Sequence, residues 1–248
     1  MAVYESLAEV YDELMDQVPY DQWADFIRDK LVSHGIRSGL VLDLGCGTGK
    51  MTGRLRNMGY DMIGLDASVD MLELARERTP EDCLYLNQDM RSFELYGTVR
   101  AVVSVCDSIN YITDEEDLVR VFRLVNNYLD PGGIFLFDVN TEHQYRDLVG
   151  NSVIAEDRDD VSFIWYNYYD RDRHLNEIDL SVFIREKDDL YRKYQELHVQ
   201  AGYTLAGIRR LLQESGLEFI AAWDGYSDRP AGEESSRIVL LARERGKE

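Results

Sequence analysis

Short apolar runs alternate with stretches of helical periodicity from about residue 40 to residue 140. This alternation is typical of βαβ units and predicts a parallel sheet covered by helices. The predicted strands comprise residues 40–44, 61–65, 83–86, 100–106 and 133–139. Three hydroxyl residues stand where N-caps of the intervening and later helices are expected: Ser68, Thr113 and Thr204.

The pattern changes after residue 150. Between residues 153 and 200, apolar and polar positions alternate with a period of two, which predicts antiparallel strands at 161–169, 175–184 and 191–200. Helical spacing returns at 204–216, and two further strands are predicted at 218–223 and 237–242. Because the antiparallel segment interrupts an α/β pattern that then resumes, we expect it to form a lid on the same domain.

Two amphipathic helical segments precede the first strand, at about residues 4–16 and 20–33, separated by Pro19. The whole pattern predicts an α/β fold: a doubly wound, mostly parallel, seven-stranded sheet with an inserted antiparallel three-stranded lid. The expected organisation is a helical cap at 1–36, a core made of 37–150 and 201–248, and the lid at 151–200.

The net charge of the chain limits the classes of partner that are expected. The chain of 248 residues holds 27 basic and 47 acidic residues, a net charge of −20. A protein this acidic repels polyanions, so neither nucleic acid nor a membrane surface is expected as a partner. No apolar run approaches the roughly 20 residues of a membrane span, and the acidic N-terminus is unlike a targeting peptide. We therefore expect a cytoplasmic protein, either a monomer or a homodimer.

The three cysteines, Cys46, Cys83 and Cys106, lie far apart in the sequence. They form no CxxC pair and have no neighbouring histidines at metal-ligand spacing, so no metal site is expected. They are interpreted as small buried hydrophobic residues in a reducing compartment.

A glycine-rich turn follows the first predicted strand, with the spacing Asp43-x-Gly45-x-Gly47-x-Gly49. Glycine allows the backbone to pass close to a ligand, and the carboxyl end of the first strand is where doubly wound sheets bind ligands. A nicotinamide-binding turn would place glycine three residues after Gly47, where Lys50 stands instead. The turn thus favours a different nucleoside cofactor.

Acidic residues end the next two strands. Asp66 can accept hydrogen bonds from both hydroxyls of a ribose, although an acid ahead of Ser68 could also serve a helix N-terminus. Gln88-Asp89-Met90 follows the third strand, where Asp89 could accept from an adenine amino group and Met90 could pack on the ring. Asp89 could equally be a solvated loop acid.

Polar residues also follow the fourth strand, in the run Cys106-Asp107-Ser108-Ile109-Asn110-Tyr111. A reacting group would meet the cofactor at this edge of the sheet. Aspartate and asparagine are nevertheless common in ordinary turns.

Together these motifs resemble those of class I S-adenosylmethionine (SAM)-dependent methyltransferases, which have a Rossmann-like fold. The resemblance rests on the run from Leu42 to Gly49, Asp66, the Gln88-Asp89-Met90 corner and Leu129-Asp130-Pro131-Gly132-Gly133. Over nearly the whole chain the sequence is similar to a bacterial subgroup close to the YqeM-type proteins, and more distantly to sugar-amine N-methyltransferases and glycine N-methyltransferase. The motifs of this wider similarity are Tyr11-Asp12-x-Leu14-Met15, Pro19-Tyr20-x-x-Trp23 and Glu196-x-His198-x-Gln200-x-x-Tyr203.

The resemblance implies SAM as cofactor, S-adenosylhomocysteine (SAH) as product, and a set of residues that bind them. Gly45, Cys46 and Gly47 would line the methionine part, and Asp43 would bind its amino group. Asp66 would hold the ribose. The adenine would be flanked or bound by Ala67, Met71, Gln88, Asp89 and Met90. Tyr11, Tyr20 and Trp23 would close the pocket, where aromatic faces suit a sulfonium, although Tyr11 and Trp23 could instead pack on the core. Cys106 and Asp107 are the remaining residues expected to bind the cofactor.

Candidate substrate-binding residues follow the fourth strand and lie on the insert: Ser108, Asn110, Tyr111, Trp165, Glu196 and His198. By alternation Glu196, His198 and Gln200 share one strand face, which could be solvated or could face the cofactor. In the second case His198 could orient or deprotonate the acceptor, with Tyr11 as a second candidate catalytic residue.

The predicted function is methyl transfer from SAM to a nitrogen or oxygen of a small molecule. Methylation of tRNA or protein, and a SAM-binding regulatory protein without turnover, stay open as alternatives.

Overall fold

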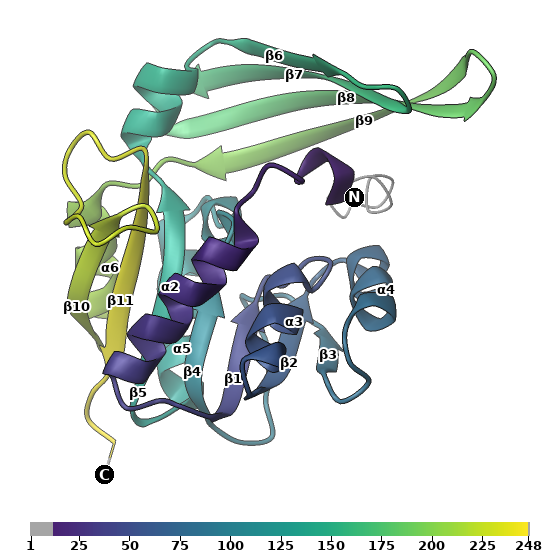
Figure 1. Cartoon of the computed structure of the whole chain (residues 1–248). Helices are drawn as coiled ribbons and strands as arrows, with labels where there is room; N and C mark the ends of the chain where they lie inside the picture. Colours follow the sequence, from purple (N-terminus) through teal and green to yellow (C-terminus); the bar gives the residue numbers. More distant parts are fainter. Residues whose placement is uncertain (1–11, 248) are drawn as a thin grey trace.

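The computed structural model describes residues 12–247, which form two sheets. In Figure 1 the smaller sheet lies above the upper ends of the strands of the larger one. The larger sheet has seven strands in the order β10-β11-β5-β4-β1-β2-β3. Its strands are β1 (Gly39–Leu44), β2 (Tyr60–Asp66), β3 (Leu84–Asn87), β4 (Val99–Ser104), β5 (Leu129–Asn140), β10 (Leu217–Asp224) and β11 (Arg237–Glu244). Only the pairings of β11, with β5 and with β10, are antiparallel. The predicted doubly wound, mostly parallel seven-stranded sheet is confirmed.

The helices cover this sheet on both faces. They are α2 (Tyr20–Ser33), α3 (Lys50–Asn57), α4 (Val69–Arg78), α5 (Glu115–Tyr128) and α6 (Leu205–Glu214), with two short helical turns η1 (Ser108–Tyr111) and η2 (Gln144–Val149). Alternate residues of the central strands pack into different layers. Leu42 packs with Phe122 of α5, whereas Val41 packs with Ile27 of α2, and all four side chains are buried. Burial on both faces explains the continuous apolar runs in the sequence.

The smaller sheet is antiparallel and has four strands in the order β6-β7-β8-β9. They are β6 (Val153–Asp157), β7 (Val161–Asp170), β8 (Leu175–Lys187) and β9 (Leu190–Ala201). The sequence predicted only three of them, so a three-stranded insert is corrected to four. Strand β6 was missed because it is an edge strand with every residue exposed, and it therefore lacks the alternation that marks a half-buried strand.

Residues Asp130 to Gly133 of the family motif lie inside β5, as an irregularity between the Val99–Leu129 and Ala101–Ile134 pairings. One local prediction was wrong. Helix α5 is capped by Asp114, which accepts hydrogen bonds from two backbone amides, and not by Thr113. The caps Ser68 and Thr204 are confirmed.

The segment before α2 contacts both sheets. Thr48 Oγ1 donates to Asp12 Oδ1 at 2.7 Å beside the glycine-rich turn. On the other side, Arg158 of the β6–β7 connection donates to the Glu13 carbonyl at 2.6 Å and pairs with Asp16 at 3.1 Å. Figure 1 shows this segment beneath the four-stranded sheet. Within residues 12–247, no helix is both long and apolar enough to span a membrane.

Candidate active site

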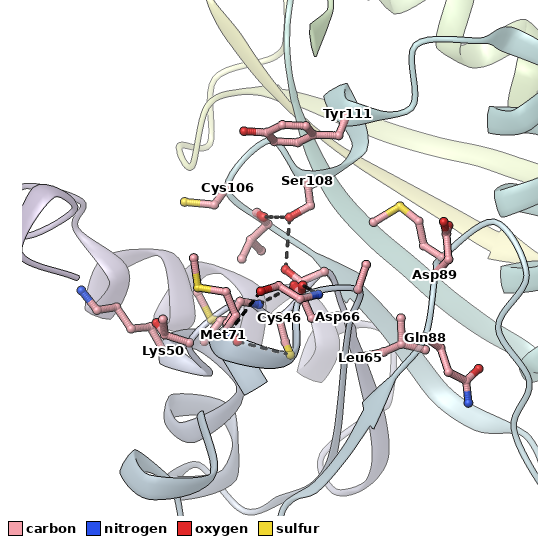
Figure 2. A pocket seen from close by; sticks show the side chains of 18 of the residues that line it. Cys46, Lys50, Leu65, Asp66, Met71, Gln88, Asp89, Cys106, Ser108 and Tyr111 are labelled. Carbon is pink, nitrogen blue, oxygen red and sulfur yellow. Dashed lines mark hydrogen bonds between the residues drawn. The ribbon is translucent and has the colours of Figure 1, made fainter. Parts of the chain in front are cut away.

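A cavity of about 320 Å³ lies where the loops after β1, β2, β3 and β4 meet (Figure 2). This volume is at the lower end of the range typical of small-ligand pockets. The predicted cofactor residues that line it are Tyr20, Gly45, Cys46, Gly47, Asp66, Ala67, Met71, Gln88, Asp89, Met90 and Cys106. The predicted substrate residues Ser108 and Tyr111 line it as well. The structure thus brings most of the predicted site to one place.

The glycine-rich turn forms one wall of the cavity. Gly45 has φ +79°, and a Cβ there would lie 2.7 Å from the Cβ of Ser108. A side chain at Gly45 would therefore collide with the loop after β4 as well as strain the backbone. Gly47 has φ +51° and no atom within 4 Å of its would-be Cβ, so its backbone is open to the cavity.

Asp66 joins the loops after β1 and β2. One carboxylate oxygen accepts from Gly47 N at 2.8 Å and the other from Ser68 N at 2.9 Å. Burial raises the pKa of Asp66, and the hydrogen bonds from backbone amides oppose that rise. The carboxylate therefore both organises the turn and faces the cavity, while the N-cap of α4 is Ser68 itself.

The corner after β3 is less available to a ligand than expected. Asp89 accepts from Arg91 Nε at 3.0 and 3.1 Å, and this contact holds the pKa of Asp89 below its usual value. The Gln88 amide pairs with the backbone of Glu94 and, in Figure 2, points away from the other labelled side chains. Gln88 thus holds the loop shape rather than offering its side chain to the cavity.

The loop after β4 carries unusual backbone angles. Cys106 and Asp107 have φ +60° and +52°, a region that non-glycine residues seldom occupy. Their amides donate to the two carboxylate oxygens of Asp138 at 3.0 and 2.7 Å, which holds the conformation. Burial raises the pKa of the Cys106 thiol to about 12. The thiol therefore stays protonated and is a poor nucleophile beside a methyl donor.

The inward face of β9 contacts the cavity wall at Tyr111. Tyr111 Oη and His198 Nδ1 lie 3.0 Å apart, and His198 Nε2 lies 3.3 Å from a carboxylate oxygen of Glu196. His198 is only 3% exposed, whereas the neighbouring Leu197, on the opposite face, is 62% exposed. The polar face of β9 therefore points toward the core, and the alternative of a solvated face is wrong.

Several predicted residues do not line the cavity. Trp23 stacks on Tyr226 with ring centroids 4.2 Å apart, as its packing alternative expected. Trp165 donates from its indole to Asn167 at 2.9 Å within the four-stranded sheet. Asn110 is fully buried and bonds to main-chain groups. Trp23, Trp165 and Asn110 therefore lie outside the cavity lining with their polar or aromatic groups engaged elsewhere, and their roles in binding stay predictions.

Three further predicted cofactor residues are Asp43, Asp107 and Tyr11. Asp43 lies beneath the glycine-rich turn, fully buried, where Thr52 Oγ1 donates to it at 2.5 Å. The Asp107 carboxylate turns to Arg237 at 2.7 Å and to Gln200 at 2.8 Å. Tyr11 lies outside the described residues.

Asp43 predicts a pH dependence of stability in the ligand-free protein. Burial raises its pKa to about 7, so the folded protein holds a proton between about pH 4 and 7 that the unfolded chain gives up. The contribution of Asp43 to stability is thus complete below about pH 4 and is lost as the pH rises through 7. From pH 5 to pH 8, the free energy of unfolding of the natural protein should fall by about 2–4 kcal/mol relative to that of Asp43→Asn, which has no titrating carboxyl at this position. Urea unfolding at both pH values measures this, and parallel pH profiles would contradict it.

Asp138 and Arg237 are functional candidates that were not predicted from the sequence. Asp138 is fully buried in β5, and Arg237 begins β11 with its guanidinium 3.0 Å from an Asp138 oxygen. A signal existed, since Asp138 interrupts an otherwise apolar predicted strand. Its partner could not be identified because it lies almost a hundred residues further along the chain.

The sequence profile of a methyltransferase domain matches residues 41–133. A YqeM protein of Bacillus subtilis (strain 168), which carries a provisional methyltransferase name, is 32% identical, with 97% of each chain covered. The dTDP-3-amino-3,4,6-trideoxy-alpha-D-glucopyranose N,N-dimethyltransferase of Streptomyces venezuelae is 27% identical over 84% of this chain and 92% of that protein. The crystal structure of a SAM-dependent methyltransferase from Clostridium acetobutylicum ATCC 824 superposes with a TM-score of 0.88 at 29% identity, covering 98% of this chain and 99% of that one.

The full-length match, the fold and the cavity beside the glycine-rich turn agree with one another. The chain belongs to the SAM-dependent methyltransferases, in a family with the YqeM-type proteins.

Proposed function

We propose that the protein transfers the methyl group of SAM to a nitrogen or oxygen of a small molecule bound between the cavity and the β6–β9 sheet. The observation that carries this proposal is the contact between Tyr111, which lines the cavity, and the buried His198 of β9. Through this contact, the His198 and Glu196 side chains of the insert lie next to the cavity wall. In this proposal the four-stranded sheet is the lid under which the acceptor binds.

The residues of the cavity fit SAM. Asp43, which lies beneath the glycine-rich turn and outside the cavity lining, has a buried Oδ1 atom with no hydrogen-bond partner among the described residues, a cost that a cationic ligand nearby would offset. Gly45 and Gly47 present open backbone for the methionine part, and Asp66 presents a carboxylate for the ribose. Ala67 and Met71 would flank the adenine, with Asp89 and Met90 at its edge.

When bound, SAM supplies an electrophilic methyl group on a sulfonium. The chain's own groups then have to exclude water, hold the acceptor in line and manage one proton. Tyr111 can orient the acceptor at the cavity edge, and His198 can take a proton through Tyr111 while Glu196 stabilises the imidazolium. A neutral amine attacks unaided, whereas an ammonium or a hydroxyl first has to lose its proton.

The names of two relatives support a nitrogen acceptor. The Streptomyces venezuelae protein acts on an amino sugar nucleotide, and a Streptomyces protein that is 27% identical over 81% of this chain is named as a cypemycin N-terminal methyltransferase. Both names describe amines. We therefore propose an amine as the first class to test.

The test is transfer of radiolabelled methyl from SAM to defined acceptors. Amino sugars, their nucleotide derivatives and small peptides with a free N-terminus form the amine set, and the corresponding alcohols form the oxygen set. Label appearing in small molecules supports the proposal. Label appearing only in tRNA or protein fractions, or SAM binding with no transfer to any fraction, would contradict it.

His198 and Tyr111 give a prediction about the chemical step. We expect His198→Gln and Tyr111→Phe to lower kcat by about 10²–10⁴ with an acceptor that must lose a proton, because the route from the acceptor to the imidazole is cut. SAM affinity, measured by calorimetry, should stay within about twofold. His174→Gln is the matched control, since His174 is an exposed histidine in the turn that joins β7 and β8 of the same insert. Equal losses in the control and in His198→Gln would rule out this role.

A further inference from the structure

Four side chains converge behind the loop that follows β4. Asp138 accepts hydrogen bonds from the backbone amides of Cys106 and Asp107. It also accepts from Tyr226 Oη at 2.6 Å and forms an ion pair with Arg237 at 3.0 Å. The arginine also pairs with Asp107 at 2.7 Å. We call Asp107, Asp138 and Arg237 the β4-loop cluster.

The β4-loop cluster contains one more carboxylate than guanidinium groups. The other contacts of its acids are neutral: Gln200 donates to Asp107 Oδ2 at 2.8 Å, and Tyr226 donates its hydroxyl to Asp138. Asp138 is fully buried, and the Asp107 and Arg237 side chains are each 22% exposed. With both acids ionised the cluster carries a net charge of −1 that solvent screens poorly.

This charge lies at the junction of the cavity and the four-stranded sheet. Cys106 and Ser108 line the cavity on either side of Asp107, and Gln200 of β9 touches Asp107 from the sheet. This step rests on the proposed function, in which a methyl donor in the cavity presents its reactive centre toward an acceptor under that sheet. The sulfonium is therefore expected on the side of the cavity where the cluster lies.

The other charges of the cavity wall are largely balanced. Asp89 pairs with Arg91, and Lys50 lies 3.3 Å from a carboxylate oxygen of Asp12. Among the described residues, Asp66 and Asp43 are further carboxylates without a basic partner. Both oxygens of Asp66 already accept from backbone amides. Asp43 lies beneath the glycine-rich turn, and burial raises its pKa to about 7, so its carboxyl is partly protonated near neutral pH. The β4-loop cluster is thus the main excess of negative charge on the reactive side.

We propose that the β4-loop cluster makes the protein select SAM over SAH. The two ligands differ by one methyl group and one positive charge, because the sulfonium of SAM becomes a neutral thioether after transfer. A fixed negative charge in a poorly solvated wall stabilises the first and not the second. The same asymmetry favours release of the product once the charge has gone.

Asp107→Asn tests the proposal without an acceptor, because it removes one charge at almost unchanged volume. Calorimetric titration of the natural protein and the variant with SAM and with SAH gives four dissociation constants. We expect the value for SAM to rise about tenfold, as for loss of one nearby charge at an effective dielectric constant of about 20, and the value for SAH to change by less than about twofold. Asp179→Asn is the matched control: it changes the net charge equally, on an exposed residue of β8.

The ratio of the dissociation constants for SAM and SAH distinguishes an effect of the cluster's charge from a structural effect of the substitution. A ratio that is unchanged in Asp107→Asn, with both ligands weakened alike, would overturn the proposal and leave the cluster a purely structural role. If Asp107→Asn does not fold, Gln200→Lys neutralises the cluster from the β9 side, and an unchanged ratio there has the same meaning. Failure of the natural protein to bind either ligand would overturn both the cofactor assignment and the selection.

Discussion

Asp66→Ala is expected to raise the dissociation constants for both SAM and SAH by at least about a hundredfold. The Asp66 carboxylate accepts from Gly47 N and Ser68 N, so it ties the glycine-rich turn to the start of α4 as well as facing the cavity. Alanine removes the ribose acceptor and leaves two amides on the cavity wall unpaired. Calorimetric titration with each ligand measures the loss.

Two further variants show which part of Asp66 matters. Glu73→Ala is the matched control, because Glu73 is an exposed acid of α4, and it should bind both ligands like the natural protein. Asp66→Asn retains a single acceptor oxygen and should fall between the natural protein and Asp66→Ala. Near-normal binding by Asp66→Ala would contradict the placement of the nucleoside beside this carboxylate.

The parts of the site that could be predicted from the sequence are local in the chain. Gly45, Gly47 and Asp66 follow apolar strands that the sequence marks clearly, and parallel strands bring their carboxyl ends to one edge. Position along the chain therefore determines position in space for these residues. The same reasoning placed Asp89 beside the cofactor, and the family resemblance placed Met71 and Cys106 there; all three line the cavity.

Two predicted cofactor residues that do not line the cavity have partners from distant segments of the chain. Trp23 stacks on Tyr226, which precedes the last strand, and Asp107 turns to Arg237 and Gln200 instead of the cavity. No periodicity in the sequence indicates such pairings, because they depend on how the four-stranded sheet and β11 pack on the core. Strand alternation grouped Glu196 with His198, but only the packing of β9 shows that this face is buried.

Arg237→Met is expected to lower the free energy of unfolding by about 3–5 kcal/mol near pH 8, because it leaves two carboxylates without their basic partner. The Arg237 guanidinium lies 2.7 Å from Asp107 and 3.0 Å from Asp138. Burial raises the pKa of Asp107, and Arg237 opposes that rise, so the variant should raise it further. Protonation would then relieve the unpaired charge, and the deficit should shrink as the pH falls from 8 toward 5. Urea unfolding at several pH values measures both effects.

The control and the conservative variant decide between charge and packing. Arg243→Met changes a partly exposed arginine of the same strand, which forms no ion pair with a carboxylate of residues 12–247, and should cost less than about 0.5 kcal/mol. Arg237→Lys retains the positive charge but cannot span both acids with one planar group, so it should recover only part of the loss. A deficit in Arg237→Met that is equally large at pH 5 and pH 8 would assign the effect to lost packing. In that case Arg237 would not hold Asp107 ionised, and the net negative charge ascribed to the β4-loop cluster would be wrong as well.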